Sequence, residues 1–254
     1  MRLKHKITKD PAGFKSVELA NARILAGLVN DFEELLLRVI EGKAGRALAD
    51  NPSAPLVQLN PIREAADKIA QFMQGVPVFA AAQKFVDASM QHGEKWADKQ
   101  LGAENHNALY SPFKVVRLPA EQAMVEMYQN QVATEIKGLL DYQNLQVQRA
   151  ITDGFRNRET IQQITRRIQE VTPMAQSKAV TIARTETLKA GNDAAKARYE
   201  KAGIQQVQWI AAYDDRVCPI CEGLHDEIFD LGEEPEIPAH PNCRCTLIPV
   251  IGDE

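Results

Sequence analysis

The sequence lacks any uninterrupted apolar run that approaches the roughly 20 residues needed to cross a bilayer. It also lacks a secretory signal. The N-terminus is basic from Met1 to Lys6, but Asp10 and Pro11 follow where an apolar stretch would be required. These absences predict a protein made in the cytoplasm, with no membrane partner.

The chain also lacks a strong excess of positive charge. Its net charge of −4 argues against a protein that wraps nucleic acid over its whole surface. The charge is unevenly placed, because residues 149–202 hold 11 basic and 6 acidic residues, whereas residues 203–254 hold 2 and 11. Such neighbouring blocks indicate either two binding faces or two segments that pack together so that their charges largely cancel.

The basic segment 149–201 is the candidate for contact with DNA, and phosphate contacts there should weaken steeply with salt. The alternative is a solvated patch, because the adjacent Arg166 and Arg167 must diverge on a helix. The basic side chains considered for this contact are Arg149, Arg156, Arg158, Arg166, Arg167 and Lys178.

Apolar residues recur at helical spacing through the first two hundred residues. We expect helices over 25–39, 62–73 and 79–90, a long Gln-rich helix after Pro119, a short helix capped by Thr160, and a final helix that ends at Gly203. We expect the first helix to start at Asp10-Pro11 or Ser16, and Pro173 to lie in the first turn of the last helix. Helices should stop at Gly75-Pro77 and at Gly93. A break over Gly42–Pro61 and a polar stretch over 102–112 should separate helices.

After Gly203 the apolar period changes to two. Val207, Trp209, Ala211 and Tyr213 alternate as in a half-buried strand, and residues 244–251 offer a second strand. The sequence therefore predicts a mostly α protein of the α+β class, with a helical body and a small C-terminal β hairpin. A two-stranded hairpin with so little apolar area is marginal in water, so something else should stabilise it.

All four cysteines fall within 28 residues, in Cys218-Pro-Ile-Cys221 and His240-Pro-Asn-Cys243-Arg-Cys245. Thiolate and imidazole are the ligands of closed tetrahedral Zn²⁺ sites, and such a site would supply folding energy where the hairpin lacks a core. We expect a metal knuckle over 214–250 with a structural zinc ion. Five candidates compete for four positions, and Cys245 is the expected spare, because strand pairing would turn it inward.

Three other interpretations of these cysteines stay open. A redox dithiol would suit Cys218 and Cys221, although such a motif begins a helix and an acidic loop is expected here. Disulfides are disfavoured in the cytoplasm but would be tolerated in an extracellular particle. A metal-dependent nuclease of the HNH kind has His225 and Asp226 as its only candidates.

Further residues carry a resemblance to a known family. The run Ala183-Arg-Thr-Glu-Thr187, then Asn192, Ala195, Tyr199, Gly203 and Trp209, then Asp215–Cys221, Gly223 and His240–Val250, is similar to the phage Mu F-like head-morphogenesis family. The resemblance covers roughly 120–251, and its cysteine–histidine portion is the most specific part. Residues 1–118 show no family motif. The chain is accordingly divided into a helical N-terminal region, 1–118, and a Mu F-like domain, 119–254.

The resemblance implies a non-enzymatic minor capsid protein of a tailed phage or prophage, assembled in the host cytoplasm and present in the virion. Its expected partners are the portal protein and the major capsid or scaffolding proteins, and delivery with the DNA is a further option. A metal-dependent nuclease or hydrolase is the alternative. Arg184 and Glu186 are expected to be structural, with one of them bonding the hairpin or the acidic loop.

Overall fold

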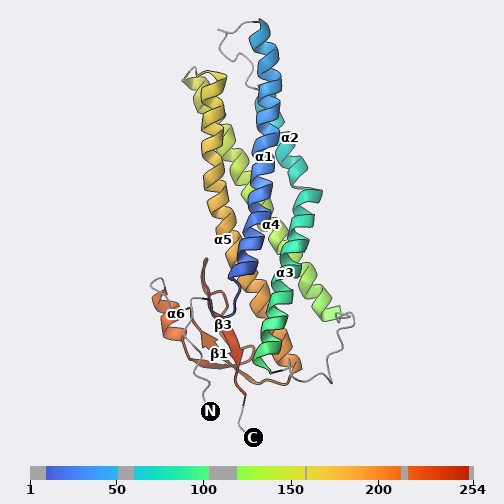
Figure 1. Cartoon of the computed structure of the whole chain (residues 1–254), viewed down its shortest axis with the longest axis vertical. Helices are drawn as coiled ribbons and strands as arrows, with labels where there is room; N and C mark the ends of the chain where they lie inside the picture. Colours follow the sequence, from blue (N-terminus) through green and yellow to red (C-terminus); the bar gives the residue numbers. More distant parts are fainter. Residues whose placement is uncertain (1–9, 51–59, 103–118, 158, 213–216, 252–254) are drawn as a thin grey trace. The chain divides into compact units, whose positions relative to one another are not determined.

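The computed structural model describes residues 10–50, 60–102, 119–157, 159–212 and 217–251 (Figure 1). The predicted fold class is confirmed, because long helices are followed by a small sheet. Among the helices formed by these residues, none has the length and apolar character needed to cross a bilayer. The elements are α1 (Lys15–Asp50), α2 (Asn60–Met73), α3 (Val76–Gln100), α4 (Pro119–Arg156), α5 (Ile161–Lys201), β1 (Gln206–Ile210), α6 (Pro219–Leu224), β2 (Ile228–Asp230) and β3 (Thr246–Pro249).

The chain forms two compact units. The first contains Met1–Asn21, Lys84–Tyr128 and Thr181–Glu254, and it carries the sheet and all the cysteines. The second contains Ala22–Gln83 and Gln129–Val180. The division of the sequence at residue 118 stays a prediction.

The core of the second unit consists of the apolar stripes expected from helical spacing. Gln143 of α4 adds a buried polar contact, because its side-chain amide donates to the carbonyl of Val29 in α1 at 2.9 Å. The stripe residues that are buried in this unit include Leu25, Leu28, Phe32, Leu36, Val132, Ile136, Leu139, Leu140, Val147, Ile151, Ile164 and Ile168.

Several predicted boundaries are confirmed. α2 ends and α3 begins around Gly75. Thr160 precedes α5 in a capping box, in which its hydroxyl accepts from the backbone N–H of Gln163 and the Gln163 side chain accepts from the N–H of Thr160. Gly203 has a φ of 74° and follows α5 in a Schellman motif, since its N–H bonds Glu200 and that of Ile204 bonds Tyr199.

Two predicted helix stops were wrong. α1 continues past Gly42 to Asp50, so the expected break begins later than predicted; residues 51–59 lie outside the described ranges, as does most of the predicted polar stretch, 103–112. α3 continues past Gly93 to Gln100. Gly93 is instead a contact residue, because a Cβ at this position would lie 2.0 Å from the carbonyl oxygen of Gly191 in α5. Glycine at both positions lets the two backbones approach closely.

The prediction for Pro173 was also wrong. Instead of opening a helix, Pro173 lies inside α5, which is continuous from Ile161 to Lys201. An internal proline removes one helical hydrogen bond and costs about 3 kcal/mol. Burial of Val171, Thr172 and Ala175 beside it offsets that cost.

The sheet has three strands rather than the predicted two, in the order β2-β1-β3 with both pairings antiparallel. The expected pairing of the first strand with the last is confirmed, with Trp209 opposite Leu247. β2 was missed, because three residues in an acidic segment are too few to show alternation. Trp209 packs with Ala195 and Tyr199 of α5, as expected, and Tyr213 lies outside the described residues.

Candidate metal centre

The first cysteine pair lies at the start of a helix, not in the loop that we expected. Cys218 is the N-cap of α6, where its sulfur accepts from the backbone N–H of Cys221 at 3.4 Å, and Pro219 occupies the first turn. Proline is suited to this position because the first helical N–H groups have no partner within the helix. One turn of helix therefore directs both sulfurs to the same side.

The second group lies on a tight turn from His240 to Cys243. The N–H of Cys243 bonds the carbonyl of His240 at 3.1 Å, and Asn242 has a φ of 64°. Proline in the second position and a residue of positive φ in the third are typical of a type II turn, and asparagine tolerates this conformation better than most residues. The Pro241-Asn242 pair thus brings His240 and Cys243 to the same place.

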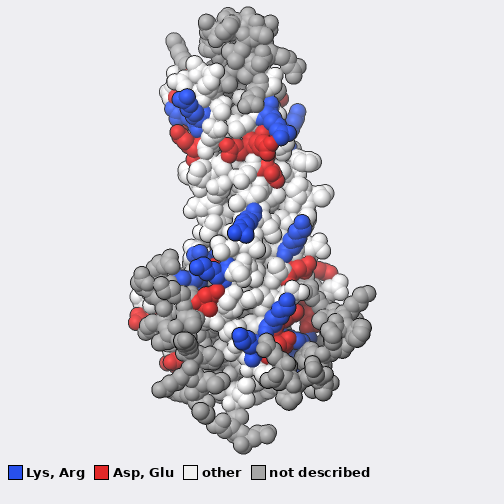
Figure 2. Space-filling view, in the orientation of Figure 1, with Lys and Arg blue, Asp and Glu red and all other residues white. Residues whose placement is uncertain are grey.

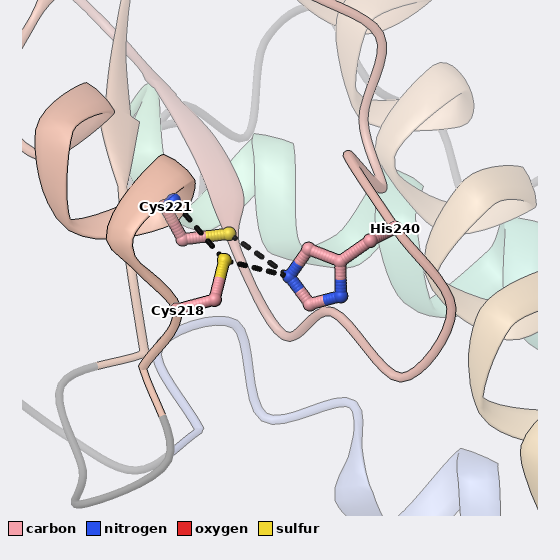
Figure 3. Close-up of side chains that lie close together, drawn as sticks. All are labelled: Cys218, Cys221 and His240. Carbon is pink, nitrogen blue, oxygen red and sulfur yellow. Dashed lines mark hydrogen bonds between the residues drawn. The ribbon is translucent and has the colours of Figure 1, made fainter.

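The two groups converge on a common point (Figure 3). The Nε2 atom of His240 lies 3.2 Å from the sulfur of Cys218 and 3.2 Å from that of Cys221. The sulfurs of Cys221 and Cys243 are 3.8 Å apart. Tetrahedral zinc with Zn–S bonds of about 2.3 Å has S–S edges of roughly 3.8 Å. A cavity of about 20 Å³ lies between these side chains, which leaves room for an ion but not for a substrate.

Cys245 joins the same cluster from the start of β3. Its sulfur lies within 4.8 Å of those of Cys221 and Cys243, while Cys218, Cys221 and His240 form a second group within the same limit. All five predicted ligands are therefore brought together, and Cys221 belongs to both groups. The choice between Cys243 and Cys245 as the fourth ligand stays a prediction.

Hydrogen bonds divide the roles of the thiols. The thiol of Cys245 donates to Cys243, and mainly for this reason the pKa of Cys243 falls to about 5 while that of Cys245 rises. Burial raises the pKa of Cys221 to about 12, and the backbone N–H of Cys221 lowers the pKa of Cys218. Cys243 and Cys218 are the thiols most ready to bind a cation as thiolates.

His240 is oriented for a ligand role. Its Nδ1 atom lies 2.9 Å from the carbonyl oxygen of Pro241, so an N–H there donates to this oxygen and Nε2 faces the sulfurs. The same bond is the main reason why the pKa of His240 is raised. A ligand histidine held through its other nitrogen is the usual arrangement at zinc sites.

Three residues of α5 hold the segment that contains the second ligand group. Thr185, Asn192 and Tyr199 are seven residues apart, which places them on one face of the helix. The hydroxyl of Thr185 accepts from the backbone N–H of Asn242 at 3.2 Å. The sequence named these positions only through the family resemblance, although their seven-residue spacing was a visible signal.

Asn192 and Tyr199 form hydrogen bonds with β3 and with Cys245, the residue that precedes it. The amide of Asn192 donates to the carbonyl of Cys245 at 3.4 Å, and its oxygen accepts from the hydroxyl of Thr246 at 2.9 Å. The phenol of Tyr199 donates to the carbonyl of Leu247 at 3.2 Å. Because Asn192, Thr246 and Tyr199 are all buried, these bonds are shielded from water.

Arg184 performs the structural role predicted for it. Its guanidinium donates to the side chain of Asn242 at 3.1 Å and to Glu18 of α1 at 3.2 Å. Burial is the largest influence on Glu18 and raises its pKa, while Arg184 opposes that rise. The pair therefore fixes the turn between His240 and Cys243 to a second helix.

The geometry gives little support to disulfides, to a redox dithiol or to a nuclease site at these cysteines. All four thiols are free, and the 3.8 Å between Cys221 and Cys243 is far longer than a disulfide bond. Cys218 does begin a helix, as a redox motif would, but the sheet beside it is antiparallel rather than part of a βαβ unit. His225 belongs to neither ligand group, and its Nδ1 accepts from the N–H of Ala211 at 3.2 Å.

Acidic and basic blocks meet in ion pairs. Lys189 bonds Glu236 at 3.5 Å and Lys196 bonds Glu234 at 3.2 Å, so the positive charge of α5 and the negative charge of the acidic C-terminal segment partly cancel. Arg167 of the predicted DNA-contact set forms two bonds with Glu159. Figure 2 shows Lys and Arg interspersed with Asp and Glu on the face drawn.

Comparison with known proteins identifies the region that carries this centre. Residues 145–248 match the family described as phage Mu protein F like protein. This part of the chain, the Mu F-like region, is similar to that family. The Mu F-like region contains all five predicted ligands together with Thr185, Asn192 and Tyr199. This similarity suggests a protein of phage head morphogenesis.

The chain also has a relative among curated proteins. The chain is similar to an uncharacterized protein of Haemophilus influenzae, with 30% identity over 109 residues. The match covers 41% of this chain and 24% of that relative, so the chain spans about a quarter of its length. No solved structure matches the chain.

Proposed function

We propose that this chain is a structural minor head protein of a tailed phage or prophage that acts in capsid assembly near the portal. A zinc ion would hold its C-terminal sheet in a fixed position on α5. The observation that carries the proposal is that the Mu F-like region combines the Cys/His cluster with the α5 residues that bond the segment Asn242–Leu247. Its partners would be the portal protein and the major capsid or scaffolding proteins, and its destination the virion.

The donor set fits zinc in a closed, structural site. Cys218, Cys221, His240 and Cys243 would hold the ion, with Cys245 as the donor to Cys243. Four protein ligands leave no coordination position for a reacting water, whereas a catalytic zinc keeps one open. When bound, zinc would supply folding energy, because it joins α6 to the loop before β3 across a small sheet.

The alternatives are a metal-dependent nuclease or hydrolase, and a DNA-contacting protein delivered with the genome. Hydrolysis would need an open coordination position, and the four protein ligands proposed for the zinc ion leave none. Contact with DNA through 149–201 would compete with the ion pairs of Arg167, Lys189, Lys196 and Arg198.

The metal part is tested by elemental analysis of protein purified under reducing conditions. We expect about one zinc per chain, as four protein ligands imply. The zinc should be lost in Cys218→Ser and retained in Cys245→Ser. Absence of metal together with oxidised thiols in the native protein would contradict the zinc site.

The assembly part needs the phage or prophage that encodes the chain. A strain without the gene, complemented with wild type or with Cys218→Ser, would be compared by electron microscopy of heads and by mass spectrometry of purified virions. We expect the protein in virions and defective heads without it. Normal heads without the protein, or metal-dependent cleavage of DNA by the purified wild type, would contradict a structural role.

A further inference from the structure

A groove in the first unit has no part in the metal centre. Its volume is about 590 Å³, and it lies between the first turns of α4, the last turns of α5 and the segment that follows β2. Apolar side chains line much of it, and Met127 is 53% exposed. The apolar lining residues are Met124, Met127, Ala197, Ile204 and Leu231.

Acidic side chains line the same groove. Asp193, Glu200 and Glu234 are opposed by the single cation Lys196. Lys196 already bonds two of these carboxylates, Asp193 at 2.7 Å and Glu234 at 3.2 Å. Glu200 is exposed on the last turns of α5. The lining therefore keeps an excess of negative charge beside its apolar side chains.

Hydrogen bonds hold the acidic side chains in the wall of the groove. Tyr128, which is buried, donates its phenol proton to Asp193, and Glu234 accepts from the backbone N–H of Gly232 at 2.6 Å while its side chain is only 4% exposed. By contrast, methionine side chains such as Met124 and Met127 adapt to different apolar partners. A preformed polar wall with an adaptable apolar lining is suited to recognising a peptide segment.

We propose that this groove binds a basic amphipathic segment of a partner protein. Its apolar side chains would lie on Met124 and Met127, and its Lys or Arg side chains would pair with Glu200 and the neighbouring acids. Charge complementarity of this kind favours a basic partner over a neutral or acidic one. The Arg198 and Lys201 side chains of a second copy would have to leave Asp98 and Glu121, which they already bond, to enter the groove.

The test uses the full chain, loaded with zinc, and three labelled helical peptides of equal length. One carries Leu and Lys at amphipathic spacing, the second has Glu in place of Lys, and the third has Gln. Fluorescence anisotropy should show that the Leu/Lys peptide binds at least about tenfold more tightly than the others, with an affinity that falls as salt rises.

Two variants with matched controls locate the binding. Glu200→Lys and Met127→Ser should each weaken binding of the Leu/Lys peptide about tenfold, because one reverses a charge and the other removes an apolar contact. Glu135→Lys makes the same charge change and Met174→Ser the same apolar change, both at exposed positions that do not line the groove, and neither should alter the affinity.

Four results would overturn the proposal. The Leu/Lys peptide could fail to bind, the Leu/Glu peptide could bind equally well, or the control variants could weaken binding as much as the groove variants. Self-association of the wild type that Met127→Ser abolishes would assign the groove to a second copy instead. None of these results bears on zinc content or on the presence of the protein in virions.

Discussion

Asn192 of α5 and Thr246 of β3 form a buried side-chain hydrogen bond of 2.9 Å, and the same Asn192 amide donates to the carbonyl of Cys245. The Asn192 side chain thus provides hydrogen-bond partners for both Cys245 and Thr246, which connect the second ligand group to the sheet. These two bonds connect the candidate metal centre to α5.

Replacing Asn192 by alanine should therefore lower the free energy of unfolding by about 1–3 kcal/mol, because the Thr246 hydroxyl and the Cys245 carbonyl would be buried without partners. Urea denaturation of the zinc-loaded protein measures the change. Asn130→Ala removes the same side chain from an exposed position on α4 and should have little effect. Equal effects from the two variants would show that the buried bonds do not stabilise the fold.

Gly191→Ala should destabilise the first unit by about 3 kcal/mol, as overpacking does. The added Cβ would lie 2.1 Å from the ring of Phe14, which is buried. Gly138→Ala is the control, because nothing lies within 4 Å of its Cβ position in α4. That change should stabilise the protein by about 0.5–1 kcal/mol, since alanine favours helix. Thermal denaturation of both variants tests the prediction, and a stable Gly191→Ala protein would contradict the close packing.

Pro173→Ala should stabilise α5 by about 1–3 kcal/mol, because alanine restores the N–H that proline lacks and removes its clash with the preceding turn. Pro219→Ala is a matched control at the first turn of α6, where the N–H has no partner within the helix, and should change stability little. Chemical denaturation distinguishes the two positions. A loss of stability in Pro173→Ala would indicate that the proline ring packs favourably within the helix.

Zinc binding near neutral pH should release protons. Burial raises the pKa of Cys221 to about 12, so this thiol is protonated in the metal-free protein and must lose its proton to become a ligand. Cys243, whose pKa is about 5, is already a thiolate and releases none. Zinc affinity should consequently fall as the pH falls, because protons compete with the metal, and most steeply once Cys243 is also protonated.

Calorimetric titration of metal-free protein with zinc, repeated in buffers of different ionisation enthalpy, counts the protons released. Cys221→Ser should reduce that count, and Cys245→Ser should leave it unchanged, because Cys245 keeps its proton as a donor to Cys243. A zinc affinity that does not change between acidic and neutral pH would contradict thiolate coordination.

The sequence by itself determined the elements whose signals are local. Helical spacing of apolar residues predicted the core stripes of α1 to α5, and alternation predicted the strands β1 and β3. Thr160 predicted the start of a short helix and Gly203 the end of another, which the structure joins in the single helix α5. The spacing of the cysteines and His240 predicted the cluster, because thiol and imidazole groups at such intervals have few other uses together.

Only the tertiary structure decided features that depend on distant contacts. Gly93 lies within α3, where it allows the close approach of Gly191 of α5. Pro173 lies within α5, where burial of the residues on both sides of it stabilises the helix. β2 forms because β1 supplies its hydrogen-bond partners, not because three residues favour a strand. The bonds that Thr185, Asn192 and Tyr199 make to the last segment exist only once that segment has folded back onto α5. The groove beside Met127 likewise depends on residues far apart in the chain.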